Sequence, residues 1–174
     1  EFRRVLFRSQ YNLERSLDDN FFCEYSFEKD LIDIDEIEAE ISKMMDKIAS
    51  PITTIPGIGR NIGAMIISEI GDFSRFSSPD KILAYAGFSP SIYQSGKLDN
   101  CYAHMEKRGS HYLRYALFQA TQRVCHLDST FSAYLAKKRA EGKHYYVAIS
   151  HAVKKLVRVI FHLEKTKQAF LKAS

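Results

Sequence analysis

Three serines and a lysine lie within GFSPSIYQSGK, residues 87–97, where a hydroxyl could act as a nucleophile. Ser89 and Ser91 flank a proline and fit hydrogen bonds within turns or caps. Ser95 precedes a glycine that would let a phosphate approach the backbone closely, and Lys97 would neutralise charge developing on that phosphate. A lone serine is inert unless a base or a metal activates it, so these residues alone favour a turn-forming role for Ser95.

A second stretch, ITTIPGIGRNIGAMIISEIG, residues 52–71, offers the chemistry of phosphate binding. Its pattern predicts a short helical turn, a tight hairpin and an amphipathic helix, which together make a helix-hairpin-helix. Gly57 and Gly59 would let backbone N–H groups at the start of the second helix approach a phosphate, where the helix dipole favours an anion. Arg60 and Asn61 follow directly, and their side chains would assist.

Other motifs compete for the same glycines. A dinucleotide fingerprint would need its third glycine where Ile62 stands, and a P-loop needs a Gly-Lys-Ser/Thr ending that this stretch lacks. A helix-turn-helix corner that touches no phosphate also favours glycine and remains an open alternative. Cys101 and His104 have the spacing of one pair of zinc ligands, but a second pair is missing, so no metal site is predicted.

Charge is distributed unevenly along the 174 residues, although the net charge is only +4. Residues 10–50 contain 12 Asp and Glu against 4 Lys and Arg, whereas residues 51–174 contain 8 against 18. The basic part suits a polyanion such as nucleic acid. No run is long and apolar enough to span a membrane and no signal peptide is visible, which predicts a cytoplasmic protein. Three widely spaced cysteines argue against a disulfide framework.

The elements that would position these residues are helices, and the predicted fold class is all-α. Residues 1–9 have no periodicity continuing into the chain and are interpreted as a junction or an artificial remnant. Residues 10–50 form an acidic helix or connector, whose apolar residues alternate three and four apart in a coiled-coil seam: Ile34, Ile37, Ile41, Met44 and Ile48. Its acids, including Glu38, are predicted to face solvent.

Residues 51–174 are predicted to form one helical domain that begins with the helix-hairpin-helix. Ser78 would start a helix that ends at Gly87, and Ser110 would cap a longer one with Leu113, Ala116, Leu117, Ala120 and Val124 facing the core. Two further helices would be separated near Gly142. Basic edges at Lys107, Arg108 and Arg114 are candidates for nucleic-acid binding. Aromatic residues among basic ones, as at 143–146, suit stacking on RNA bases or core packing equally well.

Several of these motifs together carry a family resemblance. IPGIGRNIGAMIISEIGDFSRFSSPDKILAYAGFSPSIYQSGK, then KRGSHYLRYALFQA and AVKKLVRVIF, resemble in order and spacing the C-terminal transposase domain of the insertion sequence 110/1111 (116/110/902) family. The resemblance covers about residues 51–170, and the acidic helix is similar to the family's coiled-coil connector.

The resemblance implies a transposase or DNA recombinase of a bacterial or archaeal mobile element, acting on nucleoid DNA with a structured guide RNA as partner. It implies a serine that attacks the DNA phosphodiester, and the Gln-Ser-Gly motif places that nucleophile at Ser95. It also implies a homo-oligomer formed through the coiled coil. On this basis Ser95 becomes the predicted catalytic residue, assisted by Lys97.

The family also carries a RuvC-like domain with four metal-binding acids, and the residues before the hairpin do not contain it. The resemblance therefore places the divalent metal, Mg²⁺, outside this chain, and the chain alone is not expected to cut DNA. Two alternatives stay open: a non-catalytic helix-hairpin-helix module that binds nucleic acid, and a helical oligomerisation fragment that uses the seam.

Overall fold

The computed structural model describes residues 24–89, 94–95, 98–99 and 105–171, with the side chains of 24–33 and of the two short strands excepted. Its elements, in chain order, are α2 (Glu24–Ile48), η1 (Pro51–Thr54), α3 (Arg60–Ile70), η2 (Phe73–Arg75), α4 (Pro79–Tyr85), β1 (Gln94–Ser95), β2 (Leu98–Asp99), α5 (His111–Leu127), α6 (Ser129–Ala140) and α7 (Tyr145–Thr166). The all-α prediction is confirmed, and the paired two-residue strands are a small departure from it.

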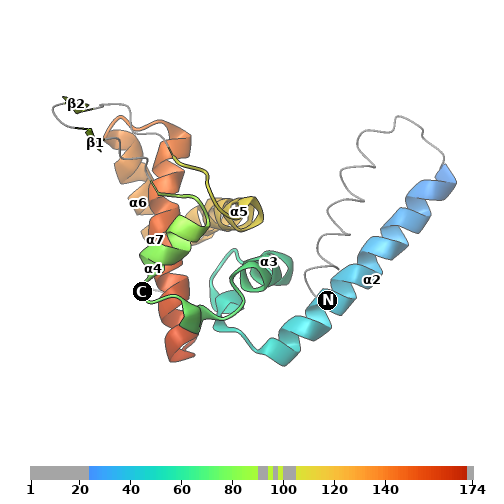
Figure 1. Cartoon of the computed structure of the whole chain (residues 1–174). Coiled ribbons are helices and arrows are strands. Elements are labelled where there is room, and N and C mark those ends of the chain that lie inside the picture. Colours follow the sequence, from blue (N-terminus) through green and yellow to red (C-terminus); the bar gives the residue numbers. More distant parts are fainter. Residues whose placement is uncertain (1–23, 90–93, 96–97, 100–104, 172–174) are drawn as a thin grey trace.

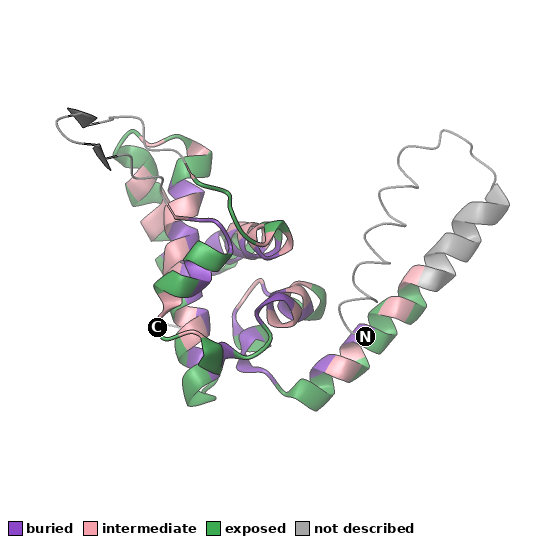
Figure 2. Ribbon diagram, in the orientation of Figure 1, coloured by how far each residue is buried: buried purple, intermediate pink, exposed green. Residues whose placement is uncertain are grey.

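The centre of the fold is the contact between α5 and α7, around which α3, α4 and α6 are arranged, whereas α2 packs on α3 (Figure 1). α5 also packs against α3 and α6, whereas α7 packs against α6, α4 and both 3-10 turns. Buried faces line this contact (Figure 2). They include all five core positions predicted for α5, which are Leu113, Ala116, Leu117, Ala120 and Val124. Spacings of three and four residues put these side chains on one face of the helix.

Local caps fix the ends of the predicted helices. The Ser110 hydroxyl accepts a hydrogen bond from the Leu113 N–H (3.1 Å) and so caps α5, as the sequence predicted. Ser78 occupies the N-cap of α4 but its side chain makes no capping bond there. α6 and α7 are separated around Gly142, which has a positive φ, again as predicted.

The acidic helix α2 packs against α3 through a stripe that differs from the predicted seam. Ile41 and Met45 are buried, with exposed fractions of 2% and 4%, and Ile37 packs beside them. Met44 is only half-buried and Ile48 is 45% exposed, although both belong to the seam. Residues four apart face a helix that crosses at an angle, whereas a 3.5-residue seam faces a parallel partner, so contact with α3 selects Met45.

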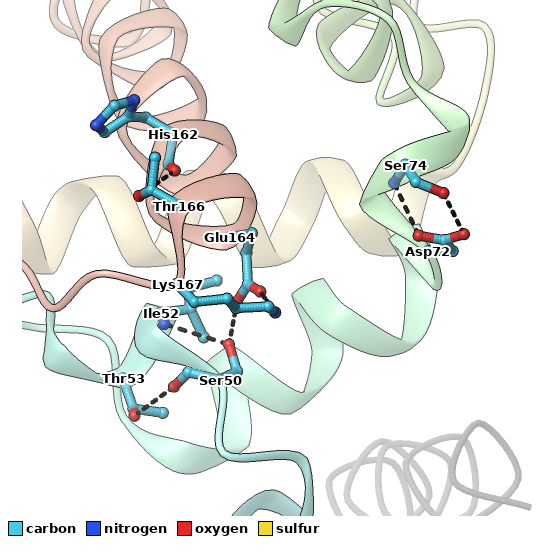
Figure 3. A network of polar contacts seen from close by, with 9 residues as sticks. All are labelled: Ser50, Ile52, Thr53, Asp72, Ser74, His162, Glu164, Thr166 and Lys167. Carbon is cyan, nitrogen blue, oxygen red and sulfur yellow. Dashed lines mark hydrogen bonds and ion pairs between the residues drawn. The ribbon is translucent and has the colours of Figure 1, made fainter.

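A polar network joins the end of α2 to the end of α7 (Figure 3). The Ser50 hydroxyl donates to the buried Glu164 carboxylate, which also accepts from the Lys167 ammonium (2.7 Å). The same Ser50 oxygen accepts from the Ile52 N–H (3.2 Å) and caps η1. Ser50 is thereby fixed to α7, and Ala49 before it has a φ of 48°, which turns the chain sharply as α2 ends.

The turn between η1 and α3 rests directly on α5. Gly57 has a φ of +96°, and a Cβ built on it would lie 2.9 Å from the backbone C of Arg123 and the backbone N of Val124. A side chain there would therefore collide with backbone atoms that cannot move independently. Gly59, two residues later, has φ −76° and open space around its Cβ position.

The two glycines should respond differently to alanine. Gly57→Ala is expected to cost about 2–4 kcal/mol of unfolding free energy, from the left-handed backbone and from overpacking against α5. Gly59→Ala, the matched control, is expected to cost only about 1 kcal/mol, because it loses a preferred N-cap residue but its new methyl group meets no other atom. Urea denaturation followed by circular dichroism measures both. Equal losses would contradict the packing role assigned to Gly57.

Candidate functional site

The predicted phosphate-binding residues lie together at the start of α3. Gly59 is the N-cap of α3, so no side chain caps the helix at this position. The first intrahelical bond runs from the Gly63 N–H to the Gly59 carbonyl (2.9 Å). The N–H groups of the first turn thus have no helical acceptor. That turn contains no acidic residue, and Arg60 and Asn61 are exposed. A 3-10 turn, a tight turn and α3 follow one another here, and their assignment as a helix-hairpin-helix stays a prediction.

Both exposed side chains are engaged by the acidic helix. Arg60 forms an ion pair with Asp46, with Nη2 2.9 Å from Oδ1 and Nη1 3.3 Å from Oδ2. The Asn61 amide donates to Glu38 Oε1 at 2.6 Å. Glu38 is exposed as predicted, but its contact with Asn61 was not foreseen, because the seam pattern contains no information about which helix lies opposite.

The two ends of the segment that carries Ser95 lie next to each other on the helical body. The Glu106 N–H donates to the Ser89 carbonyl (3.0 Å), and the Lys107 N–H donates to the Gly87 carbonyl (3.3 Å). The Ser110 N–H donates to the Tyr85 carbonyl (2.9 Å). These bonds close the base of the segment, which we call the serine loop, residues 90–105.

Arg114 stabilises this base from α5. Its Nη1 donates to the Ala86 carbonyl (3.0 Å) and to the Lys107 carbonyl (3.2 Å), and its side chain is half-buried. A Cβ on Gly87, whose φ is +75°, would lie 2.7 Å from that nitrogen and 2.6 Å from the Arg108 carbonyl. The arginine thus fills a space that a glycine leaves open, and its geometry supports a positioning role besides the predicted contact with nucleic acid.

Ser95 itself lies in β1, where it pairs with Leu98 of β2 in an antiparallel register. The side chain of Ser95 is outside the described residues, as are Ser91, Lys97, Cys101 and His104 with their full structure. Lys107 and Arg108, at the loop base, are both exposed. The structure therefore places the backbone of the predicted nucleophile and the two basic residues beside its loop, but tests no role for any of them.

An aromatic and basic surface, which we call the ring surface, joins α5 to the start of α7. Phe118 of α5 stacks on Tyr146 with ring centroids 6.0 Å apart, and Tyr146 stacks on His144 at 5.6 Å. Tyr146 is 60% exposed and Tyr115, on the same side of α5 as Phe118, is 50% exposed. Core packing does not account for rings this open, and the stacking of 143–146 on RNA bases stays a prediction.

Basic residues gather around His151, on α6, on α7 and in the turn between them. Burial and the charges of Lys143, Lys154 and Lys138, in that order, lower the pKa of His151. Lys155 lies 5.1 Å from the ring centroids of both Phe131 and Tyr134. The positive charge expected for residues 51–174 is therefore concentrated in part on α6 and α7.

Metal and thiol chemistry find little support among the described residues. No three His, Cys, Asp or Glu side chains in that part of the chain gather to hold a metal ion. The one described cysteine, Cys125, is buried and free, and burial followed by the charge of Asp128 raises its pKa to about 11. A pocket of about 380 Å³ lies beside the Ser50–Glu164 network, and none of the predicted site residues lines it. No helix in the described ranges could cross a membrane.

A sequence model described as Transposase IS116/IS110/IS902 family matches residues 49–136, half of the chain. The chain belongs to this transposase family. The match begins where α2 ends and includes the hairpin, the serine loop, α5 and most of α6. The family resemblance inferred from the motifs is thereby confirmed.

Individual relatives agree with the family assignment. The chain is 24% identical over 127 residues to the 43.6 kDa protein of insertion element IS110 of Streptomyces coelicolor, which covers 72% of this chain and 31% of the relative. It is 27% identical over 128 residues to the 44.8 kDa protein of IS116 of Streptomyces clavuligerus (74% and 32%). It is 29% identical over 123 residues to the pilin gene-inverting protein of Moraxella bovis (70% and 38%). The matched part thus spans about a third of these relatives.

Arg114 can be tested against its exposed neighbour Arg108. Arg114→Ala is expected to lower the unfolding free energy by about 1–3 kcal/mol, because two carbonyls at the loop base lose a charged donor. Arg108→Ala removes the same charge and is expected to stay within about 0.5 kcal/mol of the parent. Thermal denaturation of both variants gives the comparison. An unchanged stability for Arg114→Ala would remove the positioning role.

Proposed function

We propose that this chain is the DNA-handling C-terminal part of a transposase that cuts and exchanges DNA strands with Ser95 as nucleophile. The observation that carries the proposal is the family match across residues 49–136, which contain the Gln-Ser-Gly motif. The closed base of the serine loop adds a physical argument. A nucleophile on a loop with fixed ends needs less ordering when DNA arrives than one on a free segment.

In the proposed reaction the Ser95 hydroxyl oxygen attacks a DNA phosphorus atom. A bond forms between the serine oxygen and phosphorus as the hydroxyl gives up its proton, one bridging P–O bond breaks, and the departing deoxyribose oxygen takes up a proton. Lys97 would compensate the negative charge of the transition state. The described residues offer no ligand set for the divalent metal that the family implies, so we place that metal outside them.

DNA would be held at the start of α3. The N–H groups of the first turn, which lack helical acceptors, suit the oxygens of one phosphate group together with Arg60 and Asn61. Gly59 leaves open space above the turn, so a phosphate can approach the backbone. Gly57 contributes indirectly, since its contact with α5 fixes the turn. Lys107 and Arg108, exposed at the loop base, would bind the DNA backbone near Ser95.

A structured guide RNA is the second partner that we propose, and the ring surface supports it. The rings of Phe118, Tyr146 and His144 form an aromatic cluster where α5 meets the start of α7, with Lys143 adjacent in sequence. Unpaired bases stack on such aromatic side chains in many RNA-binding proteins. Self-association through α2 is a further part of the proposal, because Ile48 remains exposed and Met44 half-exposed on its seam.

The nucleophile is tested in the full-length protein of the source element. Ser95→Ala is expected to lower strand cleavage by at least about 10³-fold while DNA binding is retained, because the hydroxyl forms the covalent link and contributes little to affinity. Ser89→Ala, which keeps the backbone bond to Glu106, is the matched control and should cleave normally. Retained cleavage by Ser95→Ala would favour the alternative, a non-catalytic nucleic-acid-binding module.

The phosphate contact is tested in this chain by salt-dependent binding to duplex DNA. Arg60→Ala is expected to weaken binding and to reduce the slope of log K against log salt by about 1. Arg158→Ala, which removes an arginine paired with Asp80 of α4, is the control of equal charge. Fluorescence anisotropy at several salt concentrations provides the slopes. Identical slopes for the two variants would exclude a specific contact at Arg60.

A further inference from the structure

Two carboxylates of α2 engage the two side chains that the proposed function assigns to DNA. Glu38 binds Asn61 and Asp46 binds Arg60. The two acids are eight residues apart on α2, a rise of about 12 Å along the helix, so one face of α2 spans both partners. In this arrangement a helix of the same chain occupies the predicted phosphate contacts.

A carboxylate and a phosphate are alternative acceptors for the same donors. The planar guanidinium of Arg60 meets both oxygens of Asp46, and the same fork would meet two oxygens of a phosphate. The N–H groups of Arg60 that bind Asp46 cannot donate to a phosphate at the same time. Because exposed ion pairs add little to folding stability, the fold does not need the Arg60–Asp46 pair to keep α2 in place.

An apolar contact beneath these pairs also holds α2 on α3. α2 is seated on α3 mainly by Ile41 and Met45, and the Met45 methyl lies 3.5 Å from the Cβ position of Gly63. Ile37 and Ile41 also belong to the coiled-coil seam, so pairing of α2 with another helix through that seam would compete with its contact to α3. The hydrogen bond from Ser50 to Glu164 attaches the chain to α7 directly after the end of α2.

We propose that α2 is an autoinhibitory element whose carboxylates bind Arg60 and Asn61 and must release them when DNA binds there. The inference rests on the proposed function, which supplies the DNA contact. Pairing of α2 with another helix through its seam would favour the state in which Arg60 and Asn61 are released, because Ile41 cannot be buried both in that pairing and against α3.

The test is DNA binding by the whole chain with charge-matched variants of α2. Glu38→Gln with Asp46→Asn removes the two competing charges. The control, Glu36→Gln with Glu40→Gln, removes two other exposed acids of the same helix and changes the net charge equally. The first variant is expected to bind duplex DNA about 3- to 10-fold tighter than the control at the same ionic strength. Equal affinities of the two variants would overturn the proposal.

Arg60→Ala separates this inference from the proposed function. If Arg60→Ala weakens binding but the two α2 variants bind equally, the DNA contact stands and autoinhibition is wrong. If Arg60→Ala has no effect either in the parent or in the Glu38→Gln, Asp46→Asn background, the DNA contact itself is wrong. A gain that disappears when Arg60→Ala is added supports both, since the gain then depends on the side chain that Asp46 engages.

Discussion

The close contact of the 55–59 turn with α5 is the constraint on which the candidate site depends. Gly57 brings two backbones together at a distance that no side chain would permit, and this contact sets the position of α3. α5 also provides Arg114 to the base of the serine loop and Phe118 to the ring surface. One buried helix therefore positions three surfaces that are far apart in sequence, and a shift of α5 would move all of them.

The sequence predicted the features that depend on neighbouring residues. The cap at Ser110, the buried face of α5 and the break at Gly142 follow from local hydrogen bonding and helical periodicity, and all three are confirmed. The family could also be inferred, because its motifs are ordered along the chain. The role predicted for Gly57 in phosphate binding stays a prediction, whereas its role in packing follows only from the position of α5.

The features that could not be predicted from the sequence depend on which helices and loops contact one another in the fold. Arg114 was assigned to nucleic acid because it is basic, whereas the structure bonds it to two carbonyls at the loop base. Met45 replaces Met44 in the buried stripe because α2 packs on α3 within the same chain. Likewise, Glu38 and Asp46 read as solvated acids until Asn61 and Arg60 are placed opposite them. Periodicity describes one helix and leaves its partner unspecified.

The closed base of the serine loop has a consequence for how the family can diversify. Ser89 and Glu106 are joined by a backbone bond, so the ends of the intervening segment stay together whatever its length. The entropic cost of closing a loop rises only with the logarithm of its length. Insertions and deletions between these two residues therefore leave the helical body intact, and evolution can change the length of this loop while keeping the same scaffold.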